Sequence, residues 1–244
     1  MSAESIYCAH FLKIIINQGL FSTNWPIMII DFFRIDTSNL LDGLSEYLEQ
    51  LEAQIPAIQT NELKRLEAWA ESEAVDPGEY DAAFDETRWT YDYFLPRSVR
   101  YSFVVLLYIV LENQLGLLCE EIRKRRNLNL QVTDFAGGGT KRTRKYLEKV
   151  VGIKSIDWEM VEDLSKVRNC IVHTLGKVEL SRDKERLNQL AQENIGISIS
   201  NDEYADGGVI LITPEYCALS LKNIRRLFDT IFDAAGFDQK FSMH

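Results

Sequence analysis

The sequence contains few of the residues that build metal centres. Its 244 residues include three histidines, His10, His173 and His244, and four cysteines, at positions 8, 119, 170 and 217, with no CxxC pair. Scattered histidines and widely spaced cysteines argue against a structural zinc site, so we expect neither a metal nor a cofactor. Three of the cysteines lie in apolar helical runs, and we expect them to be buried, reduced thiols, as in a cytoplasmic protein.

The chain also lacks a long uninterrupted apolar run at its start. Residues 6–33 are rich in apolar side chains, but polar residues and Pro26 divide them. No run reaches the roughly 20 residues of a membrane span. The segment has neither the basic start nor the small-residue cleavage site of a signal peptide. We therefore expect it to pack on the core, without membrane contact.

The sequence has no overall excess of positive charge. The formal net charge is −10, which argues against a general nucleic-acid binder. The charge is uneven, however: residues 42–92 hold 14 acidic and 3 basic residues, and residues 123–149 hold 9 basic and 2 acidic ones. The basic segment could attract a polyanion, or both segments could be ordinary solvated helix faces.

Hydrophobic periodicity is helical along most of the chain. It predicts seven helices, at about 38–73, 82–93, 96–126, 141–151, 158–175, 182–193 and 215–235, with a turn at 75–81 between the first two. Pro56 predicts a kink or break in the first helix, and Pro96 the start of the third. The fourth, fifth and last helices are expected to be capped by Thr140, Asp157 and Thr213. The segments "GISIS" (196–200) and "GVILIT" (208–213) alternate like the strands of a hairpin.

These elements predict an all-α helical bundle with a small β-hairpin inserted before the last helix. Residues 1–94 would form an N-terminal helical region packed on the core. Residues 95–244 would form the bundle itself, with the hairpin at about 196–213.

The helix predicted at 158–175 carries an unusual arginine. On a helical wheel six apolar residues share one arc that we expect to face the core: Val161, Leu164, Val167, Ile171, Val172 and Leu175. Arg168 falls inside this arc, and arginine is almost never buried without a partner. It should therefore reach a partner, a groove or a second subunit. Asn169 and His173, four residues apart, lie together on the other side.

This set of residues could cleave RNA without a metal. A neutral imidazole can take the proton of a ribose 2′-hydroxyl, and its conjugate acid can protonate the leaving oxygen; an unperturbed pKa of about 6.5 suits both roles. An arginine fork can hold the phosphate. Asn169 could orient either residue. The spacing alone is weak support, because Arg and His five residues apart often occur by chance.

The segment "RNCIVH" (168–173) resembles the R-x4–6-H motif of HEPN domains, including the polar residue that often follows the arginine. An apolar helix (102–122) precedes it and another helix follows, so the resemblance covers roughly residues 95–236. It implies a helical bundle that dimerises with both motifs at one cleft. Many members are metal-independent endoribonucleases of toxin–antitoxin, phage-defence or RNA-processing systems. By position, Arg168 and His173 would be catalytic and Asn169 supporting.

The leading prediction is thus a cytoplasmic, homodimeric endoribonuclease that acts on RNA and pairs with an antitoxin or other protein. Five basic residues are predicted to contact RNA phosphates: Arg123, Arg125, Lys141, Arg142 and Arg144. The aromatic segment 88–94 could stack bases, or pack against the third helix. The alternative is an inactive HEPN-like interaction or RNA-binding scaffold, whose partner surface would be the acidic segment 42–92.

Overall fold

The computed structural model describes residues 31–72, 75–193, 195–200 and 208–237. The predictions made for residues 6–30, Cys8, His10 and His244 lie outside this range. The helices are α2 (Phe32–Ser72), α3 (Pro77–Arg88), α4 (Leu95–Arg125), α5 (Gly139–Tyr146), α6 (Glu159–Thr174), α7 (Lys184–Gln192) and α8 (Pro214–Ala235). Two π-helical turns, η1 (Trp89–Phe94) and η3 (Leu147–Val151), and two 3-10 turns, η2 (Val132–Asp134) and η4 (Val178–Leu180), join them.

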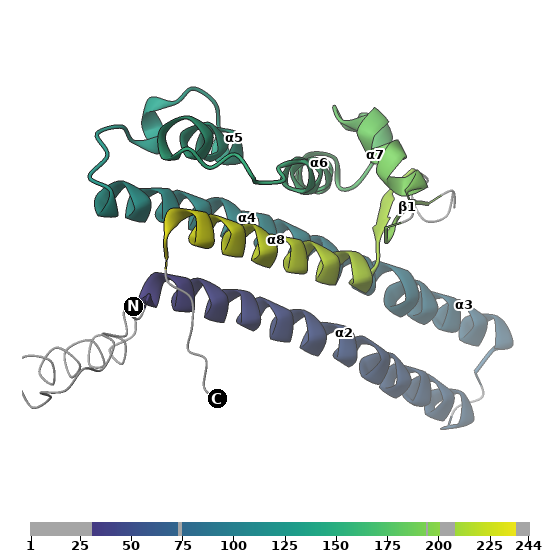
Figure 1. The fold of residues 1–244 in the computed structure, drawn as a ribbon. Helices are drawn as coiled ribbons and strands as arrows, with labels where there is room; N and C mark the ends of the chain where they lie inside the picture. The colour runs from purple at the N-terminus through teal and green to yellow at the C-terminus, as the bar shows by residue number, and fades with distance from the viewer. Residues whose placement is uncertain (1–30, 73–74, 194, 201–207, 238–244) are drawn as a thin grey trace, which may run out of the picture. The chain divides into compact units, whose positions relative to one another are not determined.

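The predicted all-α bundle with a small hairpin is confirmed. From Asp31 onward the described residues belong to one compact unit. Helix α4 is at its centre and contacts α2, α5, α6 and α8. In Figure 1, α4 and α8 run beside each other, with α2 on one side of the pair and α5 and α6 on the other. The N-terminal helix α2 is therefore built into the same core as α4.

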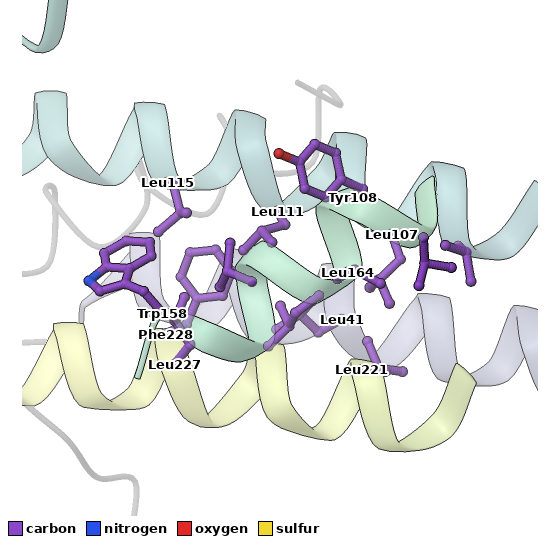
Figure 2. Close-up of a cluster of buried hydrophobic side chains, with 14 of the residues drawn as sticks. Leu41, Leu107, Tyr108, Leu111, Leu115, Trp158, Leu164, Leu221, Leu227 and Phe228 are labelled. Carbon is purple, nitrogen blue, oxygen red and sulfur yellow. The ribbon is translucent and has the colours of Figure 1, made fainter. Parts of the chain in front are cut away.

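The core lies where α2, α4, α6 and α8 meet. Figure 2 shows Leu41, Leu111, Leu164 and Phe228, one from each helix, converging in a single cluster. All four are almost fully buried. Tyr108 lies at the edge of the cluster, with its hydroxyl group directed away from it. Burial of these apolar side chains supplies most of the stabilisation that holds the helices together.

The helical stretch Pro77–Arg125 is long and apolar enough to cross a membrane, with a mean hydropathy of 1.8 over 18 residues. The central helix of a soluble bundle passes the same test. Here ten residues of α4 are buried against other helices of the chain. Length and composition therefore give only weak support for a membrane span.

Helices α2, α3 and α5 differ from the predictions. Helix α3 begins at Pro77, within the segment 75–81 expected to be a turn, because the Asp76 carboxylate accepts a hydrogen bond from the Gly78 amide (2.8 Å) and caps it. Helix α2 begins at Phe32 and not near Ser38, because the Asp31 carboxylate accepts a hydrogen bond from the Arg34 amide (3.3 Å) and caps it. It also continues through Pro56 without a break. Helix α5 begins at Gly139 and has no side-chain cap; the Thr140 hydroxyl, expected to cap it, lies instead 3.3 Å from the Tyr108 hydroxyl.

Helices α3 and α4 form one continuous helical stretch, contrary to the prediction that Pro96 starts a new helix. The turn η1 joins them, and the Leu95 amide donates to the Thr90 carbonyl, five residues back. In a straight α-helix a proline leaves one carbonyl without its donor and its ring clashes with the preceding turn. A π-helical turn before the proline changes the hydrogen-bond register there, so the helix continues.

The hairpin pairs β1 (Ile197–Ile199) with β2 (Ile210–Ile212) in antiparallel register, with Ile197 opposite Ile212. The predicted cap of the last helix is confirmed, since the Thr213 hydroxyl accepts from the Tyr216 amide (3.4 Å). The Ile210 amide donates to the Gly176 carbonyl (2.9 Å), which ties the hairpin to the end of α6.

Candidate functional site

Helix α6 has well-defined ends. The Asp157 carboxylate, predicted to cap it, accepts a hydrogen bond from the Glu159 amide (3.0 Å). At the other end the Gly176 amide donates to the Cys170 carbonyl (3.1 Å), and Gly176 has a φ of 86°. A Cβ atom at Gly176 would lie 2.1 Å from the Tyr101 hydroxyl. Only glycine therefore fits this terminus, which fixes where the helix stops.

The apolar arc predicted for α6 is partly wrong. Val172 and Leu175 do not face the core: they are 45% and 79% exposed. The buried face includes Asp163 and Cys170 instead. Leu175 follows the last residue of the helix and has a φ of 52°, so a helical wheel does not place it. Asp163 can lie on the buried face because it is paired with Arg186, as described below. Arg168, Val172 and Leu175 thus share a face that is partly open to solvent.

Arg168 is half-buried and held by its own chain. Its guanidinium carbon lies 5.2 Å from the centre of the Tyr108 ring, within the range of a cation–π contact. Its Nη1 donates to the Asn169 carboxamide oxygen (2.8 Å). Its Nε is buried and has no hydrogen-bond partner within the described part of the chain. Asn169 therefore orients the arginine, one of the two roles considered for it.

His173 is exposed and lines a pocket of about 400 Å³. The helix contributes Asn169, His173 and Thr174, and the segment before α7 contributes Leu180, Ser181, Arg182 and Asp183. Arg168 is not one of the lining residues and is linked to the pocket only through Asn169. Within one chain, the arginine that shares a pocket with His173 is Arg182.

Arg182 was not predicted as a site residue. It follows the end of α6 by eight residues, on the far side of the turn η4. That turn brings the chain back against the helix, and no periodicity in the sequence encodes such a return.

Cys170 lies beside this site but is unsuited to act as a nucleophile. Burial raises the pKa of its thiol, and hydrogen bonds to Thr174 and Ser181 offset this only in part. The attacking species would be a thiolate, which a raised pKa disfavours. Cys119 and Cys217 are also free and buried, as predicted, and burial raises the pKa of each to about 12.

A second charged cluster lies at the other end of α6. Arg186 donates to both carboxylate oxygens of Asp163, at 2.9 and 2.5 Å, and Lys166 adds a contact of 3.1 Å. Arg186 also pairs with Glu193 (3.0 Å). Burial alone would raise the pKa of Asp163, but the hydrogen bonds from Arg186 and Lys166 outweigh it and hold the pKa below its usual value.

Three of the five predicted RNA-contacting residues are engaged in ion pairs. Arg123 pairs with Glu120 (2.7 Å), Arg125 with Asp31 (2.6 Å), and Arg144 with Glu148 (2.8 Å). These pairs reduce the charge that each arginine offers to a phosphate.

The other two predicted residues lie at the start of α5. Arg142 donates two hydrogen bonds to the Gly137 carbonyl, the shorter of 2.7 Å. Lys141 is exposed and makes no ion pair within the described residues. Lys141 is therefore the most available of the five predicted cations.

The aromatic segment 88–94 is only partly buried. Trp89 and Phe94 are about half exposed and stack on each other, with ring centres 5.3 Å apart and an interplanar angle of 18°. Arg97 lies over the Tyr93 ring at 4.7 Å. Trp89 and Phe94 thus stack on each other, while Tyr93 contacts Arg97 of α4.

Among the described residues, no group of three or more His, Cys, Asp or Glu side chains is arranged to hold a metal ion. Comparison of the chain with protein-family models, with curated proteins and with solved structures gave no match. The residues and their geometry therefore carry the functional argument.

Proposed function

We propose that this protein is a metal-independent endoribonuclease of the HEPN type. The observation that carries the proposal is the pocket at the end of α6, where the exposed His173 lies beside Asn169. Asn169 in turn holds Arg168 by a hydrogen bond of 2.8 Å. An accessible imidazole with a positioned arginine nearby is the minimum set for cleavage through a ribose 2′-oxygen.

In the proposed reaction the neutral His173 imidazole takes the proton of the 2′-hydroxyl. The 2′-oxygen then attacks the adjacent phosphorus, and the bond from phosphorus to the 5′-oxygen of the next nucleotide breaks. The leaving oxygen receives a proton from the imidazolium. The products are a 2′,3′-cyclic phosphate and a 5′-hydroxyl, with no net gain or loss of protons by the enzyme.

A homodimer would complete this site. Arg168 lies outside the His173 pocket of its own chain, and the next turns of the same face expose Val172 and Leu175. Helix α4 likewise exposes Leu106 and Ile109. Two copies meeting along α6 would cover apolar surface and bring Arg168 of one copy towards the pocket of the other. We place the dimer in the cytoplasm, as a toxin or phage-defence protein with an antitoxin or similar partner.

The test is RNA cleavage in EDTA by wild type and His173→Ala. We expect wild type to cleave and the variant to lose about 10²–10⁴-fold in rate, the usual contribution of a general acid–base. A substrate with 2′-deoxyribose at the cleaved position should resist wild type. Cleavage of that substrate, or equal rates for the two proteins, would contradict the mechanism.

The alternative is an inactive HEPN-like scaffold. Two observations favour it: Arg168 points to Tyr108 and Asn169 instead of the pocket, and the stacked Trp89 and Phe94 offer an exposed surface beside acidic residues. A wild-type protein without RNase activity that binds a partner through Trp89, with loss of binding in Trp89→Ala, would support the scaffold.

A further inference from the structure

The part of the pocket wall formed by residues 180–183 is held in place on both sides. Val178 is buried, and its amide donates to the Gly208 carbonyl (3.0 Å). The Ser181 amide donates to the Val178 carbonyl (3.0 Å), and the Asp183 amide donates to the Ser181 hydroxyl (3.2 Å). Leu187, fully buried in α7, anchors the other end of the segment. Arg182 is therefore carried by a short segment fixed on both sides.

Arg182 differs from the arginine four residues later. Arg186 is surrounded by carboxylates, whereas the exposed Arg182 side chain makes no hydrogen bond or ion pair within the described residues. Asp183 is the one acidic residue that lines the described pocket. Asp183 lies at the N-terminus of α7, where the helix dipole stabilises its negative charge. The dipole therefore competes with the Arg182 guanidinium for the Asp183 carboxylate. The Arg182 guanidinium is thus left with donors to offer a ligand.

We propose that Arg182 is a phosphate-binding residue of the His173 pocket, and that the pocket accepts one nucleotide of the RNA through its 3′-phosphate. This rests on the proposed function. A volume of about 400 Å³ is within the roughly 300–1,000 Å³ of small-ligand sites. A guanidinium fork matches the geometry of phosphate oxygens. His173 and Arg182 come from the same chain, so each chain binds the phosphate by itself and Arg168 of a second copy adds to it.

The test is binding of small probes, independent of cleavage. The probes are uridine 3′-monophosphate, inorganic phosphate and uridine, titrated into wild type, Arg182→Ala and Arg226→Ala. The C2 proton of His173 reports binding in NMR spectra, assigned by its loss in His173→Ala. Arg226 is the matched control, because it is an exposed arginine of α8 that does not line this pocket.

We expect both phosphate probes to bind wild type and to shift the His173 signal, and uridine to bind much more weakly. Arg182→Ala should raise the dissociation constants by at least about tenfold, as for loss of a charged hydrogen bond. Arg226→Ala should change them by less than about twofold. Unchanged binding by Arg182→Ala, equal binding of uridine, or no shift of the His173 signal would overturn the proposal.

The outcomes separate this proposal from the proposed function. Cleavage that depends on His173, with Arg182→Ala binding like wild type, overturns the role of Arg182 and leaves the ribonuclease intact. Phosphate binding that depends on Arg182, without cleavage by wild type, supports the pocket and rejects the ribonuclease.

Discussion

The two ends of α6 differ in whether their charged side chains form ion pairs. At the N-terminal end, Asp163 and Arg186 neutralise each other beside the core, with further carboxylates around the arginine. At the C-terminal end, His173 and Arg182 share an open pocket and make no ion pair within the described residues. The first arrangement stabilises the fold; the second leaves donors and a titratable ring free for a ligand. The helix thus carries a neutralised ion pair near one end and polar groups without ion-pair partners, among the described residues, near the other.

The largest effect should come from breaking the paired end. Asp163→Ala leaves Arg186 partly buried without its main partner, and we expect it to lower the free energy of unfolding by about 3 kcal/mol. His173→Ala, at the open end, should change it by less than about 0.5 kcal/mol. Urea denaturation of both variants measures the difference. Equal losses would erase the distinction between the two ends.

Gly176→Ala should have the next largest effect. The new Cβ atom would meet the Tyr101 hydroxyl in a backbone conformation with φ of 86°, and we expect a loss of about 2 kcal/mol. Combining it with Tyr101→Phe removes the closest clash but also the hydrogen bond to the Ile210 carbonyl. In a double-mutant cycle, the double variant should therefore lose less stability than the sum of the losses in the two single variants. If the two losses are strictly additive, the Cβ atom added at position 176 does not clash with the Tyr101 hydroxyl.

Acid should weaken the ion pair of Asp163 with Arg186 and so lower the free energy of unfolding. The pKa of Asp163 is held below its usual value in the folded protein, so its contribution is complete above about pH 4 and is lost as the pH falls through the folded-state pKa. Between about pH 4 and 2, the stability of wild type should therefore fall more steeply than that of Asp163→Asn. Thermal melts across this range test the expectation. Parallel pH profiles would mean that other carboxylates cause the acid sensitivity.

The smallest effect on stability should come from the exposed apolar residues. Leu175→Ser changes a side chain that is 79% exposed, so the fold should lose less than about 0.5 kcal/mol. If α6 forms the dimer interface, the same change should shift sedimentation velocity from dimer to monomer. Leu219→Ser, on α8, is the control, since Leu219 is also exposed and lies on another helix. If Leu175→Ser leaves the dimer unaffected, the interface does not include this face of α6.

Much of the fold was predictable because its signals are local. The cap of α8 at Thr213, the strands around 197 and 212 and the end of α6 at Gly176 each depend on residues close in the sequence. The junction of α3 and α4 was not, because Pro96 is equally compatible with a helix start and with the residue after a π-helical turn. Hydrogen-bond register, which periodicity does not report, decides between them.

The site was predictable only in part. The spacing of Asn169 and His173 correctly places them on one side of α6, where both line the pocket. The burial of Asp163 depends on its ion pair with Arg186, more than twenty residues away, and so could not be read from the helix alone. Arg182 enters the site only through a tertiary turn. A long-range partner thus explains why a carboxylate lies on the buried face of α6.

The π-helical turn η1 has a consequence for how α3 and α4 work together. Each residue added to or removed from a helix rotates everything beyond it by about 100° about the axis. Helices α3 and α4 both contact α2, and η1 sets the angular phase between them. Removing one residue from Trp89–Phe94 would turn the half-buried Phe84 to another side while leaving α4 in place. The turn therefore fixes the angle, about the common helix axis, between the acidic helix α3 and α4. Because α4 packs against α6, the same angle relates α3 to the helix that carries His173.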